Sequence, residues 1–353
     1  MRVLIIGCGG LGGVVAGYLA RSGHEVWVVT TNAAIAEAIE SDGLQVRSAG
    51  RSFRTEVAIR SGVPGSDVDP FDTVLLAIPP NGVEEATRTI LPWLSDTGRL
   101  VCFQNGLCEE RVARIVGPER VVGAVVFWGA SMPAPGVVER TSAGGFALGR
   151  LDATVDDPLR KIATLLGTVG PTRLTLNLRG VRWSKLAVNC AMSTFGTIGG
   201  EPVGVLMRRS DARQLGIEVI SEAVTVARAD GVRLEKPAGW IDLGWLVVGA
   251  GTGPRSAAMW LKHAMVLAAV TPYRRLRSSM LAAIERGRPP AVDFLNGEVI
   301  DRAERLGIPV PINRAARDLV WAIARGEQRP GVQTLHALYE RTRTRTSTES
   351  PRE

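Results

Sequence analysis

Cysteine and histidine are scarce in this chain, which has four cysteines and three histidines among 353 residues. The cysteines form no CxxC pair, so the sequence supports no disulfide framework. The histidines show none of the spacings typical of zinc ligands, and we expect no metal site. Disulfide-stapled and metal-dependent classes of protein are therefore disfavoured.

Long apolar segments are also lacking. The closest candidate, Ala257 to Val270, is interrupted by Lys262 and His263, so we expect no segment to cross a bilayer. The first residues lead directly into a strand-like run and show no cleavable signal pattern. These features predict a cytoplasmic protein with no membrane partner.

Negative charge is outnumbered, and the formal net charge is +7 at pH 7. The surplus is spread along the chain, partly in Arg341–Arg345, and no aromatic residues alternate with a basic stripe to stack bases. We therefore expect no nucleic-acid partner. A small anionic substrate fits the surplus equally well.

What is present indicates a well-filled globular protein. Apolar residues make up 45% of the chain, and the mean hydropathy is +0.11. A length of 353 residues favours two domains.

Up to about residue 175, short apolar segments alternate with helical periods. The expected strands are Val3–Ile6, Glu25–Val29, Thr73–Ile78, Leu100–Phe103, Val121–Val126, Gly136–Glu139 and Phe146–Leu148. The expected helices are Val14–Arg21, Ala33–Ser41, Val83–Leu94 and Leu159–Leu166. This α/β alternation predicts a Rossmann-type, doubly wound parallel sheet, covered on both faces by helices, over residues 1–175.

From residue 176 to 340 the pattern changes to long helical periods. The expected helices are Lys185–Met192, Ala212–Asp230, Ala257–Ala269, Ser278–Arg286, Asp293–Leu306 and Asn313–Arg325. We therefore expect an all-helical second domain that carries the substrate and catalytic residues, with a loop at Gly249–Pro254. Residues 341–353 are polar and are expected to form a disordered tail.

A glycine-rich segment, Gly7–Gly12 (GCGGLG), follows the first expected strand and matches GxGxxG. In that context the motif indicates dinucleotide binding, because its backbone can approach a pyrophosphate at the start of a helix. The candidate cofactor-binding residues of the motif are Gly7, Gly9, Gly10, Leu11 and Gly12. A glycine-rich turn used only for packing remains the alternative.

Two further positions follow the ends of expected strands, where open parallel sheets bind ligands. The second strand ends at Thr30-Thr31-Asn32, which offers neither the acid that binds a free ribose hydroxyl nor an arginine for a 2′-phosphate. Thr31 is thus a candidate cofactor contact that leaves the choice of cofactor open. Asn105 is placed to bind cofactor or substrate, although an Asn-Gly turn would account for it equally well.

Lys185, Asn189 and Ser193 lie four residues apart in an otherwise mostly apolar run. On a helix they form a polar stripe too narrow for an ordinary solvent-facing side. Desolvation of an amine favours its neutral form, which suits such a lysine to exchanging protons. A lysine whose amine reaches solvent from the edge of a packed helix is the competing interpretation.

Several segments together resemble the ketopantoate reductases (2-dehydropantoate 2-reductases), in the order found in that family. The segments are Gly7–Gly12, Gln104–Gly106, Lys185–Cys190, Ser278–Leu281 and Val292–Gly297. The lysine–asparagine segment is specific to the family, and the resemblance extends to about Ile323. It implies a Rossmann domain followed by a helical domain, an active site in the cleft between them, and a role in pantothenate biosynthesis.

The resemblance also implies roles for individual residues. Lys185 is similar to the family's catalytic lysine and would act as general acid, while Asn105 would lie near the nicotinamide. Asn189 and Ser279 would contact the substrate, with Ser193 at the place of another family asparagine. The implied cofactor is NADPH, with NADH left open, and a homodimer is left open as well. Three arginines lie near Ser279 in the sequence, namely Arg274, Arg275 and Arg277. They would either bind a substrate carboxylate or, as the simpler interpretation, be solvated side chains.

The chain departs from the family pattern at several of these places. Thr31 stands where the family usually has an arginine, and Pro79 stands where it often has a lysine. In the family, these two basic residues bind the 2′-phosphate of NADP. Val203 replaces an asparagine and Ala291 a glutamate, and an alanine side chain forms no hydrogen bond. The changes at Thr31 and Pro79 leave the choice between NADPH and NADH open, and the losses at Ser193, Val203 and Ala291 suggest a substrate less polar than ketopantoate.

We therefore predict an NAD(P)H-dependent reductase of a 2-oxo acid or related ketone. Two alternatives remain at this point: a catalytically silent dinucleotide-binding regulatory protein, and oxidation of a hydroxyacid on the same fold.

Overall fold

The computed structural model describes residues 1–65, 68–236, 242–248, 256–271 and 274–348. The chain forms two compact units, Met1–Leu178 and Arg179–Glu353, close to the boundary predicted at residue 175. The predicted loop at Gly249–Pro254 lies outside the described residues.

The first unit is built on a twisted sheet. Among the residues that the structure describes, this sheet has eight strands in the order β12-β11-β8-β7-β6-β1-β2-β5. Its strands are β1 (Arg2–Ile6), β2 (Glu25–Thr30), β5 (Ala58–Ser61), β6 (Phe71–Leu76), β7 (Leu94–Cys102), β8 (Val121–Val126), β11 (Phe146–Gly149) and β12 (Thr172–Leu174). All neighbours are parallel except β8 and β11, so the predicted parallel sheet is confirmed with one antiparallel pairing.

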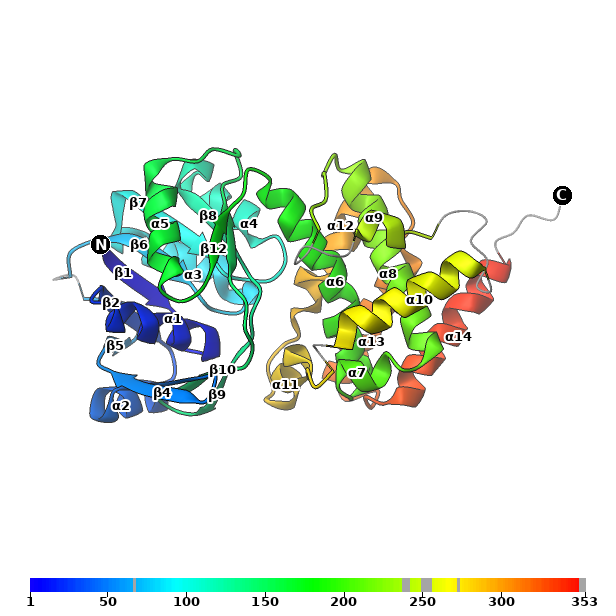
Figure 1. The fold of residues 1–353 in the computed structure, drawn as a ribbon, viewed down its shortest axis with the longest axis horizontal. Helices are drawn as coiled ribbons and strands as arrows, with labels where there is room; N and C mark the ends of the chain where they lie inside the picture. The colour runs from blue at the N-terminus through cyan, green and yellow to red at the C-terminus, as the bar shows by residue number, and fades with distance from the viewer. Residues whose placement is uncertain (66–67, 237–241, 249–255, 272–273, 349–353) are drawn as a thin grey trace. The chain divides into compact units, whose positions relative to one another are not determined.

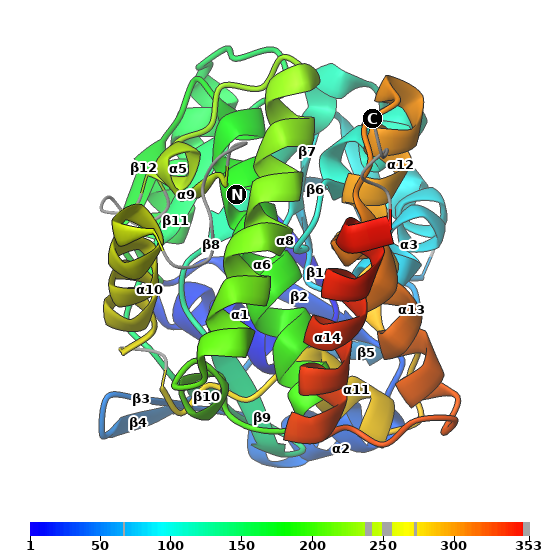
Figure 2. The same ribbon diagram turned by 90° about the vertical axis from the view of Figure 1, so that its right-hand side faces the viewer.

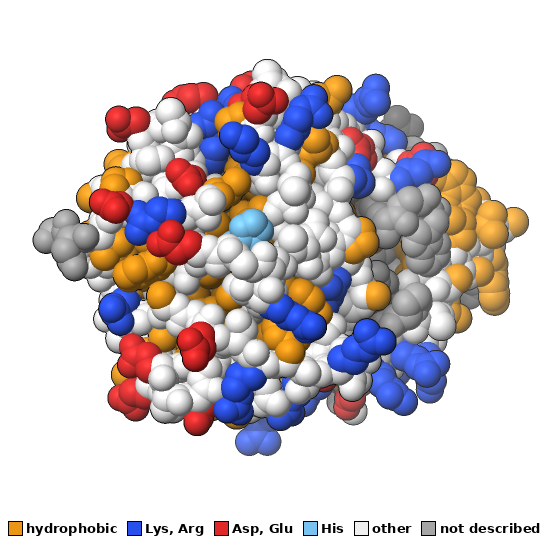
Figure 3. Space-filling view, turned by 60° about the vertical axis from the view of Figure 1, so that its left-hand side comes forward, with side chains coloured by type: hydrophobic (Ala, Val, Ile, Leu, Met, Phe, Trp, Pro, Cys, Tyr) orange, Lys and Arg blue, Asp and Glu red, His pale blue; other side chains and the backbone are white. Residues whose placement is uncertain are grey.

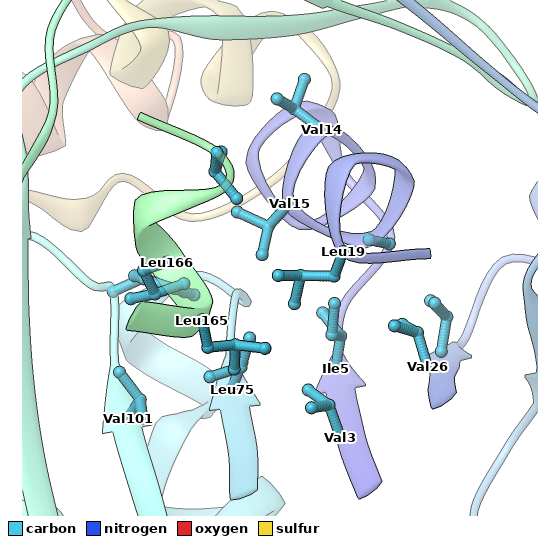
Figure 4. Close-up of a cluster of buried hydrophobic side chains, with 14 of the residues drawn as sticks. Val3, Ile5, Val14, Val15, Leu19, Val26, Leu75, Val101, Leu165 and Leu166 are labelled. Atoms are coloured by element: carbon cyan, nitrogen blue, oxygen red, sulfur yellow. The ribbon is translucent and has the colours of Figure 1, made fainter. Parts of the chain in front are cut away.

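Helices cover the sheet, as Figure 1 shows in the blue to green part of the chain. They are α1 (Gly10–Arg21), α2 (Ala33–Asp42), α3 (Val83–Ile90), α4 (Cys108–Val116) and α5 (Asp157–Gly167). Val3 and Ile5 of β1 belong to one apolar core with residues of α1 and α5, which Figure 4 shows, among them Val15, Leu19 and Leu166. Because β1 is buried on both faces, its residues can be apolar throughout, and they contribute to this core.

A smaller sheet, of order β4-β3-β10-β9, packs on α1. Its strands are β3 (Leu44–Ser48), β4 (Arg51–Thr55), β9 (Ala130–Ala134) and β10 (Val137–Arg140). Gly13 and Gly17 of α1 allow the approach, because a Cβ there would lie 2.6 Å and 2.3 Å from the side chains of Val138 and Val46. Of these strands the sequence predicted β10 alone.

One predicted helix is shorter than expected. Val83–Leu94 was expected to be helical throughout, but α3 ends at Ile90, and Leu91–Trp93 form a 3-10 turn (η2) before β7. Pro92 explains this, since proline has no backbone N–H to extend a helix.

All the regular secondary structure described in the second unit is helical. Its helices are α6 (Leu178–Gly199), α7 (Val203–Leu206), α8 (Ser210–Ala229), α9 (Leu243–Leu246), α10 (Ala257–Val270), α11 (Ser279–Glu285), α12 (Asn296–Leu306), α13 (Pro311–Ala324) and α14 (Val332–Thr348), with a 3-10 turn η6 (Ala291–Phe294). α8 packs against α9, α10, α12, α13 and α14. It also lies along α6, as Figure 2 shows, since Gly216 approaches Phe195 and Ala191.

The disordered tail predicted from residue 341 is wrong for residues 341–348, which continue α14. Leu335 and Leu338 are buried, and Arg343 forms an ion pair with Glu218 of α8. These contacts hold a helix that the polar composition of its last turns did not reveal. Residues 349–353 lie outside the described residues.

None of the helices described combines the length and apolar character needed to span a membrane. On the face drawn in Figure 3, basic and acidic side chains are interspersed rather than gathered into one patch. The absence of a nucleic-acid partner stays a prediction.

Candidate active site

The glycine turn joins β1 to α1, and two of its glycines are required by the turn itself. Gly7 has φ +103°, and its N–H donates to the carbonyl of Val29 at 2.8 Å. A Cβ on Gly12 would lie 2.0 Å from the carbonyl oxygen of Gly7. Side chains at either position would distort the turn.

Gly10 is also required by packing, because its Cβ would lie 2.7 Å from the backbone nitrogen of Ser131 on β9. Gly9 differs from the other three. It is exposed, has φ −84°, and beyond its chain neighbours no atom lies within 4 Å of the place its Cβ would take. Nothing inside the protein therefore requires glycine at this position.

The open space at Gly9 lies at the N-terminus of α1. The first turn of α1 has no acidic residue and no side-chain cap, and Leu11 within it is half-buried. Exposed N–H groups and the helix dipole favour an anion at such an end. The geometry at Gly9 thus fits the close approach of a phosphate better than a turn used only for packing.

The other candidates of this unit lie at the same edge of the sheet as the turn. β2, β5 and β6, β7 lie on opposite sides of β1, so the strand order reverses between β1 and β6. Parallel α/β sheets bind ligands outside the carboxyl ends of their strands at such a reversal. Thr31 follows β2, Pro79 follows β6 and Asn105 follows β7, and all three are exposed.

The loop after β7 holds Asn105 in a particular way. The buried Gln104 donates from Nε2 to the carbonyls of Leu76 and Ile78, at 2.9 Å and 3.1 Å, which ties this loop to the end of β6. Gly106, with φ +92°, makes the turn, and Asn105 itself does not have a positive φ. The backbone therefore does not require an asparagine at 105, which weakens the turn interpretation.

In the helical unit, α6 presents one half-buried face. Within Val181–Gly199, all of it described, the residues that are not fully buried are Lys185, Val188, Asn189, Met192 and Ser193. Their spacing of three and four residues places them on a single side of the helix. The predicted polar stripe thus coincides with the accessible face, with two apolar residues beside it.

Ser279 is brought close to this face by its neighbour. Ser278, which is 7% exposed, caps α11 and donates from Oγ to the carbonyl of Ser193 at 2.9 Å. Its Oγ also lies 2.8 Å from Oγ1 of Thr197. Gly196 permits the contact, since its Cβ would lie 3.1 Å from that of Ser278. Ser279 follows at once and is exposed.

The remaining positions singled out from the sequence have other surroundings. Arg274, Arg275 and Arg277 are exposed. Val203 is buried, and its N–H donates to the carbonyl of Leu276 at 3.0 Å, so it packs within the unit. Ala291 is half-buried at the start of η6.

Sequence reasoning missed the residues that fix this arrangement. Ser278 was noted only as part of a motif, although a serine before an apolar helical run is a recognisable N-cap signal. Asp293, in the separate segment Val292–Gly297, accepts from Arg317 at 2.6 Å and from Trp321 at 3.2 Å, which indicates a structural role.

Comparison with known proteins agrees with both units. The family model "Ketopantoate reductase PanE/ApbA" matches residues 3–153, and the model of its C-terminal domain matches residues 177–324. The chain belongs to the ketopantoate reductase family. It is therefore an oxidoreductase, and the family to which it belongs uses NAD(P)H to reduce small keto acids.

Relatives of this ketopantoate reductase family member match over nearly their whole length. It is 24% identical over 333 residues to the 2-dehydropantoate 2-reductase of Pyrococcus horikoshii, covering 94% of this chain and 99% of that one. A similar match, 24% over 348 residues, is found with the 2-dehydropantoate 2-reductase of Mesorhizobium japonicum, covering 92% and 98%.

Solved structures share the fold. A PanE/ApbA family ketopantoate reductase from Ralstonia eutropha superposes with a TM-score of 0.77 at 27% identity, covering 93% of this chain and 100% of that one. D-mandelate dehydrogenase, solved with NADH and anilino(oxo)acetate, gives a TM-score of 0.78 at 21% identity, covering 92% and 99%.

Proposed function

We propose that this protein reduces a 2-oxo acid or related ketone with NAD(P)H, and that Lys185 is its general acid. The observation that carries the proposal is the accessible face of α6, where an amine, an amide and a hydroxyl stand in one line. A lysine on the solvent edge of a helix would not need polar neighbours along the same line.

The chemistry follows from the residues of that face. A reduced nicotinamide, when bound, would supply a hydride to the ketone carbon. The ammonium of Lys185 stabilises the negative charge that develops on the ketone oxygen and then donates its proton to that oxygen. Asn189, Ser193 and Ser279 hydrogen-bond the polar groups of the substrate, which holds the ketone in position.

For the cofactor we propose NADPH, with NADH as the competing choice. Gly9 and the first turn of α1 would hold the pyrophosphate, as would the other residues of the Gly7–Gly12 turn. Thr31 has a hydroxyl that can bind either a 2′-phosphate or a ribose, and Pro79 adds no charge. Asn105 would contact the nicotinamide end. D-mandelate dehydrogenase, a structural relative, was solved with NADH.

A second candidate concerns the substrate. Val188 and Met192 alternate with the polar residues on the face of α6, and Ala291 offers no side-chain hydrogen bond. We therefore propose a 2-oxo acid with an apolar side chain, in preference to the hydroxylated ketopantoate of pantothenate biosynthesis. A soluble cytoplasmic location and a homodimer stay predictions.

The test is an assay of NADPH and NADH oxidation with ketopantoate, a branched aliphatic 2-oxo acid and an aromatic 2-oxo acid. Lys185→Ala should lower turnover by about 10² or more, as expected for a lost general acid. Lys161→Ala, an exposed lysine of α5, is the matched control.

Turnover that survives Lys185→Ala would overturn the catalytic assignment. Cofactor binding without turnover on the whole panel, in either direction of reaction, would instead favour the catalytically silent regulatory protein.

A further inference from the structure

The helical unit contains a largely buried chain of polar side chains that ends on α6. We propose that Thr194, Asn296, Asn313 and Glu222 form a positioning chain, which fixes the rotation of α6 and so holds Lys185 and its polar neighbours in their reacting arrangement. This inference rests on the proposed function of that face.

The chain begins on α8. Glu222 accepts from the backbone N–H groups of Ile312 and Asn313, at 2.9 Å and 2.8 Å. These are the first-turn amides of α13, whose own N-cap residue, Val310, has no capping side chain. Glu222 therefore supplies, from another helix, the acceptor oxygens that cap the first amides of α13.

Asn313 connects Glu222 to Asn296. Its Nδ2 donates to Glu222 at 2.7 Å and to the carbonyl of Val219 at 3.2 Å, and its Oδ1 accepts from Nδ2 of Asn296 at 2.9 Å. Both asparagines are fully buried. The hydrogen bonds that join Asn313, Asn296 and Thr194 are thus made where water cannot replace them, while those of Glu222 are partly buried, and losing one partner is costly.

Asn296 then forms hydrogen bonds with α6 at two points one turn apart. Its Nδ2 donates to the carbonyl of Cys190 at 3.3 Å, and its Oδ1 accepts from Oγ1 of Thr194 at 2.6 Å. Cys190 directly follows Asn189 and Thr194 directly follows Ser193. These two hydrogen bonds therefore lie next to the residues proposed to hold the substrate, Asn189 and Ser193.

The accessible face of α6 requires directional contacts to keep its side chains in one orientation. Apolar packing is non-directional, so the buried leucines and alanines of α6 tolerate small rotations. Hydrogen bonds weaken steeply with misalignment, and a shift of about 1 Å in a reacting group can cost about 10²-fold in rate. The positioning chain supplies the directional restraint.

The test compares two substitutions of Thr194, which is buried at 0% exposure. Thr194→Val keeps the shape and removes the hydroxyl, whereas Thr194→Ser keeps the hydroxyl and removes a methyl. The positioning chain predicts that kcat falls by about tenfold in Thr194→Val with KM nearly unchanged, and that Thr194→Ser restores most of it. A site that matters only for packing predicts the reverse order, and that order would overturn the proposal.

A second pair tests the far end of the chain. Glu222→Gln places an amide NH₂ against one of three converging donors, so it should lower kcat as Thr194→Val does. Glu218→Gln is the matched control, because Glu218 lies one turn earlier on α8 and binds Gln214 and Arg343 instead. Equal loss of kcat in both variants would contradict a role of this chain.

A readout independent of turnover separates this inference from the proposed function. Amide hydrogen exchange over residues 185–199 should be faster in Thr194→Val than in wild type and in Thr194→Ser. The affinity for NADPH, carried by the other unit, should stay unchanged in all variants. If no 2-oxo acid is reduced by wild type, the exchange result still decides whether the chain restrains α6, and equal exchange in all three proteins would refute it.

Discussion

Gly9 and Gly12 belong to one motif, yet the structure gives them different tasks. A methyl group on Gly9 would enter open space, whereas one on Gly12 would lie 2.0 Å from a backbone oxygen. Gly9→Ala should therefore fold normally and weaken NADPH binding by about tenfold or more, because the methyl group would occupy the proposed path of the phosphates. Gly12→Ala should lose about 3 kcal/mol of stability or more.

Thermal unfolding and cofactor titration by fluorescence measure the two effects. Normal cofactor affinity in Gly9→Ala would contradict a phosphate site at the turn.

Glu222 gives a prediction about pH. Burial raises the pKa of its carboxyl from 4.5 to about 7, with Glu218 acting in the same direction and the amides of Ile312 and Asn313 opposing it. Because the folded state then binds the proton more tightly than the unfolded chain, the ionised Glu222 lowers stability above pH 7, and stability is regained as pH falls toward 4.5.

Subtracting the unfolding free energy of Glu222→Gln from that of wild type cancels the contribution of other titrating groups. This difference should become about 2 kcal/mol more favourable to wild type as the pH falls from 8 to 5. Urea unfolding at several pH values measures it. A difference that is constant with pH would show that Glu222 keeps an ordinary pKa.

At the scale of elements, the contrast between Ser278 and Ser279 separates structure from function. Ser278→Ala removes a helix cap and a buried hydrogen bond to α6, and should cost about 2 kcal/mol of stability. Ser279→Ala changes an exposed hydroxyl and should raise KM for the keto acid while leaving stability within about 0.5 kcal/mol.

Denaturant unfolding and steady-state kinetics distinguish the two variants. An unchanged KM in Ser279→Ala would remove it from the proposed substrate contacts.

Elements with a strong period could be predicted from the sequence, and those held by tertiary contacts could not. The spacing of Lys185, Asn189 and Ser193 predicted the accessible face of α6. The hairpin of β3 and β4 was missed because its turn, Ala49-Gly50, has two positive φ values without the usual Asn-Gly sequence.

The positioning chain was missed for a different reason. Thr194 and Asn296 are 102 residues apart in the sequence, and Asn313 and Glu222 are 91 residues apart. No local pattern marks an asparagine as buried, so this part of the site becomes visible only when the helices are placed.

For the whole molecule, the two compact units predict that the first one folds by itself. Leu178, its last residue, is 2% exposed and packs over Gly123 of β8 and Gly149 of β11, where a Cβ would lie 2.6 Å and 3.1 Å from it. A fragment of residues 1–178 should therefore fold, bind NADPH and show no reductase activity, because it lacks Lys185.

The boundary expected from the sequence supplies the control. A fragment of residues 1–175 lacks Leu178 and leaves the surface over both glycines uncovered, which should cost about 2 kcal/mol of stability relative to residues 1–178. Circular dichroism with thermal melting compares the two, and cofactor fluorescence tests binding. Failure of the 1–178 fragment to bind any nicotinamide dinucleotide, while folded, would locate cofactor binding outside the glycine turn.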